Sequence, residues 1–181
     1  MEPSRFEPDH VDGYLVFVTT LEDADLAFIH EQPDDPDTVR AWASGGHRGR
    51  HWVLVDEQGE VGAYVAVVPL MGWASHVGEL RLVVRPDLRG RGLGARLARH
   101  AVIQAAEMGL QKLQVSIVAD AEALVSMFTS LGFRPEALLA DHFRTRDGDY
   151  HDLMILTHSA RDHWAELAAV GIDQERANPV Q

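Results

Sequence analysis

The segment Arg89-Gly90-Arg91-Gly92-Leu93-Gly94 combines glycines and arginines in a pattern suited to holding a phosphate group. Glycine has no Cβ, so the backbone N–H groups of such a turn can come within hydrogen-bond distance of phosphate oxygens. The turn follows a predicted strand and precedes a predicted helix, whose free N-terminal N–H groups and dipole also favour an anion. A plain tight turn is the alternative, and the position of the segment favours phosphate binding.

Two nucleotide-binding motifs fit this segment poorly. A P-loop requires GxxxxGK[ST], and the only lysine of the chain, Lys112, lies in no such loop. The dinucleotide fingerprint is closer, because Gly90, Gly92 and Ala95 match G-x-G-x-x-A. However, the turn does not follow the strand directly, and the region 109–114 has no carboxylate for a ribose. A nucleotide-dependent oxidoreductase is therefore a less favoured alternative.

Hydrophobic periodicity and turn residues place secondary-structure elements around this turn. We expect strands at residues 13–19, 51–56, 61–68, 77–84, 113–118, 136–144 and 150–157. We expect helices capped by Thr20, by Asp35 and by Asp120, and a longer helix over residues 93–108. The order β-α-α-β-β-β-α-β-α-β-β indicates a mixed α/β fold, and the three consecutive strands exclude a regular doubly wound sheet.

The length of 181 residues suits one well-packed domain. We expect residues 13–158 to fold as one unit, with an N-terminal tail at 1–12 and a C-terminal helix or tail at 159–181. The absence of cysteine excludes disulfides, thiolate metal sites and a cysteine nucleophile, and it fits a cytoplasmic location. Neither an export signal nor an apolar run long enough to span a membrane is present.

The charge of the chain is distributed unevenly. The net charge of -12 argues against nucleic acid and anionic membranes as partners. Residues 1–40 hold eleven acidic residues against two arginines, a local charge of -9. Residues 81–99 hold six arginines against Asp87 alone, a local charge of +5. This acidic protein therefore has one cationic segment, which coincides with the glycine-rich turn.

The segment VGELRLVVRPDLRGRGLGARL resembles motif A of the GCN5-related N-acetyltransferase (GNAT) family. Arg89, Gly92 and Gly94 match the signature [QR]-x-x-G-x-[GA] of that motif, and LVSMFTSLGF resembles a later helix that ends in Gly-Phe. The resemblance covers about residues 13–157. It implies a GNAT-like fold, a central, mixed and mostly antiparallel sheet flanked by helices, with acetyl-CoA as co-substrate.

The resemblance also assigns roles in binding acetyl-CoA. The backbone of Leu82, Val83 and Val84 would contact the pantetheine arm. The pyrophosphate would lie in the cradle formed by Arg89, Gly90, Arg91, Gly92, Leu93, Gly94 and Ala95. Phe128 stands where many members of the family have a tyrosine near the cofactor sulfur, and we expect it to pack against the cofactor or the core.

Acetyl transfer requires a neutral amine, and the candidate general base is Glu79, on the strand that leads into the turn. Strand alternation places Glu79 on the same face as Arg81 and Val83. The alternative is that Glu79 forms a structural ion pair with Arg81 or another arginine.

The sequence places no proton donor at the position where the family has an acid for the leaving thiolate. Phe128 has no proton to give, and Ala121 replaces an asparagine that is frequent at the start of this helix in the family. His142 and Tyr150, in the last predicted hairpin, are alternative acids. We expect no metal site, because the ten histidines form no familiar ligand set.

In the family, the early helices and the last hairpin border the acceptor site. Because the early helices are the acidic part of this chain, we expect a cationic acceptor, either a small-molecule amine or a protein lysine or N-terminus. The absence of the tyrosine leaves a second possibility, a non-catalytic CoA-binding sensor or partner-binding module. Trp73 and Trp164 are candidate contacts of a homodimer, and local packing explains them equally well.

Overall fold

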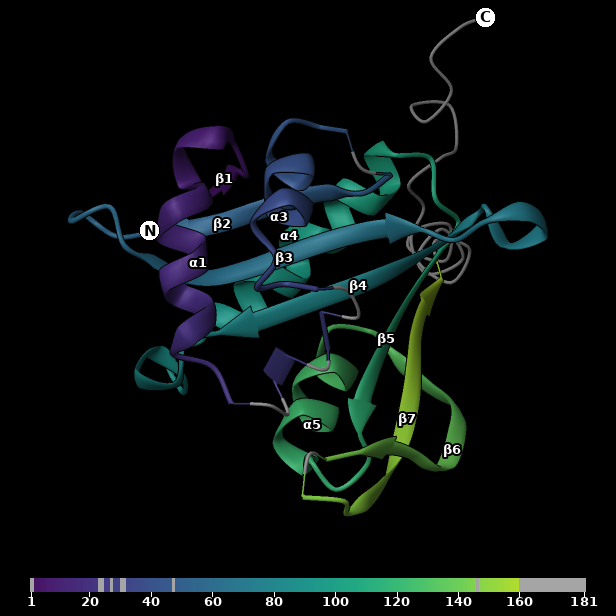
Figure 1. The fold of residues 1–181 in the computed structure, drawn as a ribbon. Helices are drawn as coiled ribbons and strands as arrows, with labels where there is room; N and C mark the ends of the chain where they lie inside the picture. The colour runs from purple at the N-terminus through teal and green to yellow at the C-terminus, as the bar shows by residue number, and fades with distance from the viewer. Residues whose placement is uncertain are drawn as a thin grey trace, which may run out of the picture.

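The structure, a computed structural model, describes residues 2–22, 25–26, 28–29, 32–46, 48–145 and 147–159. It is built on a seven-stranded sheet with the order β1-β2-β3-β4-β5-β7-β6 (Figure 1). The strands are β1 (Pro3–Arg5), β2 (Arg50–Val55), β3 (Val61–Pro69), β4 (Val77–Val84), β5 (Lys112–Val118), β6 (Arg134–Arg144) and β7 (Tyr150–Ser159). Only the β4–β5 pair among these strands is parallel, so the expected mixed, mostly antiparallel sheet is confirmed.

Helices cover both faces of the sheet. They are α1 (Val11–Thr19), α3 (Pro36–Ala43), α4 (Leu93–Glu107) and α5 (Glu122–Ser130). In Figure 1, α1 and α3 lie in front of β2 and β3, and α4 lies behind them. None of the helices in the described part of the chain is long and apolar enough to cross a membrane.

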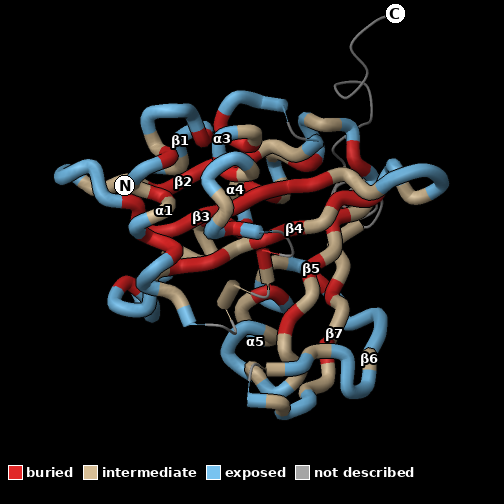
Figure 2. Tube along the Cα trace, in the orientation of Figure 1, coloured by how far each residue is buried: buried red, intermediate tan, exposed pale blue. Residues whose placement is uncertain are grey.

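Two apolar clusters fill the spaces between the sheet and the helices. Successive residues of a strand point to opposite faces, so Leu54 and Val65 pack with α4, whereas Val53 and Tyr64 pack with α1 and α3. Figure 2 shows the result as long buried stretches in β2 and β3 and shorter ones in β4. The central strands β2, β3 and β4 are therefore packed on both faces, and this packing fixes the position of the end of β4.

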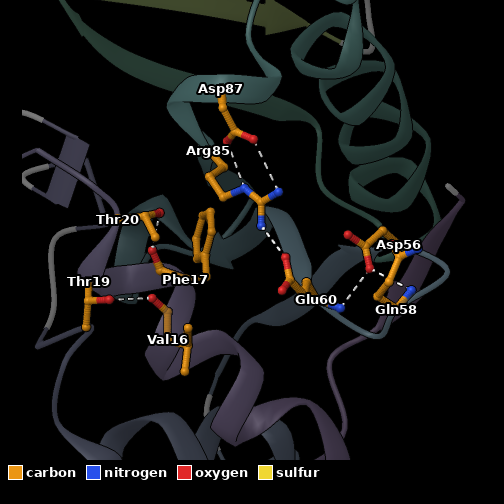
Figure 3. Close-up of polar contacts among 9 residues, drawn as sticks. All are labelled: Val16, Phe17, Thr19, Thr20, Asp56, Gln58, Glu60, Arg85 and Asp87. Carbon is orange, nitrogen blue, oxygen red and sulfur yellow. Dashed lines mark hydrogen bonds and ion pairs between the residues drawn. The ribbon is translucent and has the colours of Figure 1, made fainter.

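The strand predicted at residues 13–19 was wrong, because these residues belong to α1. The segment is rich in β-branched and aromatic residues, but Tyr14, Phe17 and Val18 share one helical face and are buried with Val11. Thr20, which we expected to start the next helix, is the C-cap of α1, and its hydroxyl donates to the Phe17 carbonyl at 2.7 Å (Figure 3). The first strand is β1, within the expected tail, and it pairs with β2.

The other predicted strands and helices are present where the structure describes them, whereas the predicted cap of α5 was wrong. Asp35 caps α3, and its Oδ2 accepts a hydrogen bond from the Thr38 backbone N–H at 2.8 Å. Hydrogen bonding by the Thr38 side chain, and then by its backbone N–H, lowers the pKa of Asp35. Asp120 does not cap α5 with its side chain, because the N-cap is Ala121. The helix expected before Pro33 lies partly outside the described residues. Of the expected C-terminal segment 159–181, the structure describes Ser159 alone, so Trp164 lies outside the described residues.

The strands β4 and β5 meet along a short ladder and then separate. Their parallel pairing covers Val77↔Lys112, Gly78↔Leu113 and Glu79↔Gln114. Beyond Glu79, β4 continues beside β3 as far as Val84, while β5 continues beside β7 (Figure 1). The sheet is therefore split between β4 and β5, and Glu79 stands where the split begins.

Candidate active site

The glycine-rich turn connects the end of β4 to the start of α4. After a short 3-10 helix at Pro86–Leu88, Gly90 and Gly92 adopt left-handed backbone conformations with φ of 73° and 78°. Gly92 is the N-cap of α4, and no side chain caps this end of the helix. The first-turn N–H groups of α4 therefore remain available for an anion, as the sequence predicts for a phosphate cradle.

The helices α4 and α5 come close together just after this turn. A Cβ on Gly94 would lie 3.3 Å from the Met127 Sδ and 3.9 Å from the Leu82 Cδ2. Gly94 therefore allows α4 to approach both α5 and the separated part of β4. This places the turn, the open end of β4 and one face of α5 around a common region.

Ion pairs neutralise much of the cationic segment around the turn. Arg85 donates hydrogen bonds to Asp87 at 2.8 and 3.3 Å and to Glu60 at 3.1 Å (Figure 3). The bonds from Arg85 lower the pKa of the Asp87 carboxyl, and the same bonds raise the pKa of Arg85. Arg91 is exposed and donates to the backbone carbonyl of Asp87 at 3.1 Å. The local field is therefore weaker than the sequence charge of this segment suggests.

Arg89, the first residue of the signature, makes two contacts on the strand side of the turn. Its Nη2 donates to the Asp25 Oδ2 at 2.6 Å, and its Nε donates to the Val84 carbonyl at 3.1 Å. Asp25 precedes Arg89 by 64 residues, and nothing in the sequence indicates this contact. One predicted partner of the pantetheine arm, the Val84 carbonyl, is thus engaged by Arg89.

Glu79 and Arg81 form an ion pair on the face of β4 that α1 and α3 cover. The Glu79 Oε2 accepts hydrogen bonds from the Nε and Nη2 of Arg81 at 3.1 and 2.9 Å. The two side chains are 15% and 7% exposed. The ion pair that the sequence offered as an alternative is present, at the point where the sheet splits.

Phe128 and the candidate acids His142 and Tyr150 lie on other elements than this ion pair. Phe128 is 2% exposed and packs edge-on against Phe133, with ring centroids 5.2 Å apart, in the cluster beneath α4 and α5. His142 is exposed on β6. Tyr150, at the start of β7, is 60% exposed and lies beneath the Arg144 guanidinium.

The β6–β7 hairpin contacts the segment that follows α1. Phe28 stacks on Phe143 of β6, with ring centroids 6.3 Å apart and an angle of 28° between the planes. Phe143 also contacts His151 of β7 at 6.1 Å. Asp25, Phe28 and Phe143 were not predicted as site residues, because isolated residues of these types belong to no motif.

A separate groove of about 550 Å³ runs along another side of α5. Its lining includes Glu122, Val125 and Thr129 of α5 and Met154 of β7. These α5 residues lie on the far side of the helix from Met127, which faces Gly94. Within the described part of the chain, no group of three or more metal-ligating side chains occurs.

Comparisons with known proteins show to which family the chain belongs. A family model described as "Acetyltransferase (GNAT) family" matches residues 17–133. The uncharacterized N-acetyltransferase YjgM of Escherichia coli (strain K12) is 31% identical over 111 residues, which cover 61% of this chain and 65% of that protein. The match thus spans less than two thirds of that relative.

Two further comparisons agree. The L-methionine sulfoximine/L-methionine sulfone acetyltransferase of Pseudomonas paraeruginosa (strain DSM 24068 / PA7) is 31% identical over 126 residues, covering 67% of this chain and 73% of that protein. The structure of a GCN5-related N-acetyltransferase from Kribbella flavida has a TM-score of 0.71 at 21% identity, covering 87% of this chain and 96% of that one, and it shows the same fold. With the split sheet, the glycine-rich turn and the family match over residues 17–133, the chain belongs to the GNAT family of acetyltransferases.

Proposed function

We propose that this protein is an acetyl-CoA-dependent N-acetyltransferase that transfers an acetyl group directly to a primary amine. The observation that carries the proposal is the split between β4 and β5 after Glu79, together with the uncapped start of α4 at the far end of β4. An open strand edge suits the amides of pantetheine, and an uncapped helix start suits a pyrophosphate.

The residues that would bind acetyl-CoA lie along this path. The backbone of Leu82, Val83 and Val84 would contact pantetheine, and the turn Arg89–Ala95 would hold the pyrophosphate mainly through backbone N–H groups. Arg91 is exposed and would add a positive charge. Phe128 would support the thioester end from the core. Acetyl-CoA supplies the activated acetyl group as a co-substrate.

Glu79 is the proposed general base. Its carboxylate would accept a proton from the ammonium form of the acceptor, directly or through a water, and Arg81 would hold the carboxylate in place. The amine nitrogen would then attack the thioester carbon, the carbon–sulfur bond would break, and the leaving thiolate would take up the second amine proton. Because the chain has no cysteine, no acyl-cysteine intermediate can form.

A cationic acceptor follows from the distribution of charge. Residues 1–40 carry a local charge of -9, and most of their carboxylates lie before α1 or between α1 and α3, the helices that cover the sheet face of Glu79, Arg81 and Val83. Carboxylates in these segments would favour a positively charged small-molecule amine, or a lysine or N-terminus of a protein. A cytoplasmic enzyme would find both kinds of acceptor.

Calorimetric titration with CoA tests the cofactor part of the proposal, and the absence of binding at millimolar CoA would contradict it. Release of free thiol from acetyl-CoA, measured with 1,4-diaminobutane, an alanine-terminated peptide and L-methionine sulfone, tests the chemistry and the acceptor charge. Activity on L-methionine sulfone alone, a zwitterion without net positive charge, would contradict a cationic acceptor. Glu79→Gln should lower kcat by a factor of about 10² to 10⁴. The exposed Glu57→Gln is the matched control.

A second candidate is a CoA-binding module without catalysis. It is favoured by Phe128, whose buried side chain cannot donate a proton where many relatives in the family have a tyrosine. This candidate predicts that the wild-type protein binds CoA and acetyl-CoA but releases no thiol with any amine of the panel. Turnover that Glu79→Gln lowers and Glu57→Gln does not would exclude it.

A further inference from the structure

Arg89 connects the phosphate turn to a segment far from it in sequence. Its guanidinium donates to the Asp25 carboxylate at 2.6 Å and to the carbonyl of Val84, the last residue of β4, at 3.1 Å. The Asp25 side chain is 19% exposed and the Arg89 side chain 43% exposed. A short, charge-assisted contact with a mostly buried carboxylate fixes the position of both side chains.

Three residues beyond Asp25, a second contact reaches the other part of the split sheet. Phe28 stacks on Phe143 of β6 at 6.3 Å, and β6 is joined through β7 to β5. Asp25 is joined through Arg89 to the end of β4. The residues Asp25 and Phe28 therefore connect two strands, β4 and β5, that have no ladder beyond Glu79.

We propose that Arg89 is a positioning residue that holds Asp25 and Phe28, on the side where the amine would bind, against the phosphate turn. In this arrangement the backbone of the turn and Arg91 hold the pyrophosphate, while the Arg89 side chain is committed to Asp25 and Val84. The proposal rests on the acetyltransferase function proposed above. It predicts that the contact between Arg89 and Asp25 affects the affinity for the amine and leaves the affinity for CoA almost unchanged.

The variants Asp25→Asn and Arg89→Gln each remove the charged contact and keep side chains of similar size. Each should raise the KM for the best amine of the panel by about tenfold or more, the effect of losing a hydrogen bond between charged groups. Each should change the Kd for CoA, measured by calorimetry, by less than about twofold. Because both variants remove the same contact, the double variant should be no worse than the more impaired single variant.

Two further variants separate positioning from general effects of charge and stability. Asp37→Asn removes a carboxylate from the same acidic region, in the exposed ion pair with Arg40, and should leave the KM for the amine unchanged. Asp25→Glu keeps the charge and should restore most of the amine affinity lost in Asp25→Asn. Thermal unfolding of every variant shows whether a change in KM accompanies a loss of folded protein.

Three results would overturn the proposal. Arg89→Gln could weaken CoA binding about tenfold while Asp25→Asn leaves the KM for the amine unchanged, which would make Arg89 a phosphate ligand. Asp25→Asn could behave like Asp37→Asn, or the effects of the two single variants could add in the double variant. A wild-type protein that neither binds CoA nor releases thiol would instead contradict the acetyltransferase function itself, so the two failures are distinguishable.

Discussion

Gly78 of β4 lies opposite Leu113 of β5, and the side chains of Leu110 and Leu113 occupy the space that a Cβ on Gly78 would need. A Cβ on Gly78 would lie 3.2 Å from the Leu113 Cδ1 and only 2.6 Å from the Leu110 Cδ1. The residue after Gly78 is Glu79, where the two strands separate. The absence of a side chain at Gly78 therefore leaves space beside β4 for the side chains of Leu110 and Leu113.

Gly78→Ala should destabilise the protein by about 1–3 kcal/mol, because the new methyl group overpacks the contact with Leu110 and Leu113. Urea unfolding followed by circular dichroism measures this change. Gly13→Ala in α1 is the control, since its Cβ would lie 3.4 Å from the nearest atom, of Val61, and alanine favours a helix. Equal stability of the Gly78 variant and the wild type would contradict this account of the ladder.

Tyr64→Phe should cost about 1–3 kcal/mol of folding free energy. A 2.7 Å hydrogen bond joins the Tyr64 hydroxyl to the His51 Nδ1, and both residues are buried between the sheet and α1 and α3. Trp42 stacks on both rings, so a phenylalanine would keep the packing and lose the hydrogen bond. The exposed Tyr150→Phe should change the midpoint of unfolding very little, and comparable losses in the two variants would contradict the prediction.

The ion pair of Lys112 and Glu136 should give a pH-dependent part of the stability. Hydrogen bonds from Lys112 and from the Thr157 hydroxyl, both 2.6 Å, lower the pKa of Glu136 from its ordinary value of 4.5. A lowered carboxyl pKa stabilises the fold above the ordinary value, and this contribution is lost as the pH falls through the lowered pKa.

Glu136→Gln should therefore lower stability at pH 7 by about 0.2–1 kcal/mol, a value that allows for solvent screening of a half-exposed pair. The difference between wild type and variant should disappear in acid. Thermal unfolding across the acid range measures it, with the exposed Glu57→Gln as control. A difference that persists at the lowest pH would show that Glu136 acts through packing rather than charge.

His100 should make the protein less stable in mild acid. Burial against Trp52, whose ring lies 5.1 Å away, lowers the pKa of His100 below 6.5, and the nearby Glu107 and Glu2 oppose this shift in part. Between 6.5 and the lowered pKa the unfolded chain binds the proton more readily, so stability falls as the pH falls. On going from about pH 7.5 to about pH 5.5, the wild type should lose more thermal stability than His100→Gln. Equal losses would contradict the assignment.

The sequence predicted some of the parts that depend on local chemistry, although the caps expected at Thr20 and Asp120 were wrong. The turn at Gly90 and Gly92 and the Asp35 cap each depend on a few adjacent residues, and each is present in the structure. The segment 13–19 was predicted as a strand because it is rich in β-branched and aromatic residues. In the structure it belongs to α1, because its helical spacing lets one face be buried against β3.

The contacts that organise the candidate site were not predictable in this way. Arg89 was assigned to phosphate through its motif, and its contact with Asp25 spans 64 residues. The stacking of Phe28 on Phe143 likewise depends on the folded arrangement of distant segments. A single sequence does not indicate which distant side chains come into contact, so these contacts can be identified only in the folded structure.

Lys112 is the only lysine among 181 residues, and its ammonium group is held by the Glu136 carboxylate at 2.6 Å. If the protein binds a reactive thioester, Lys112 is the single lysine side chain of the protein that this thioester could acetylate, and its amine is already engaged in a hydrogen bond. Adventitious labelling of lysine side chains by an isotopic acetyl donor should therefore be confined to one peptide, which mass spectrometry can monitor.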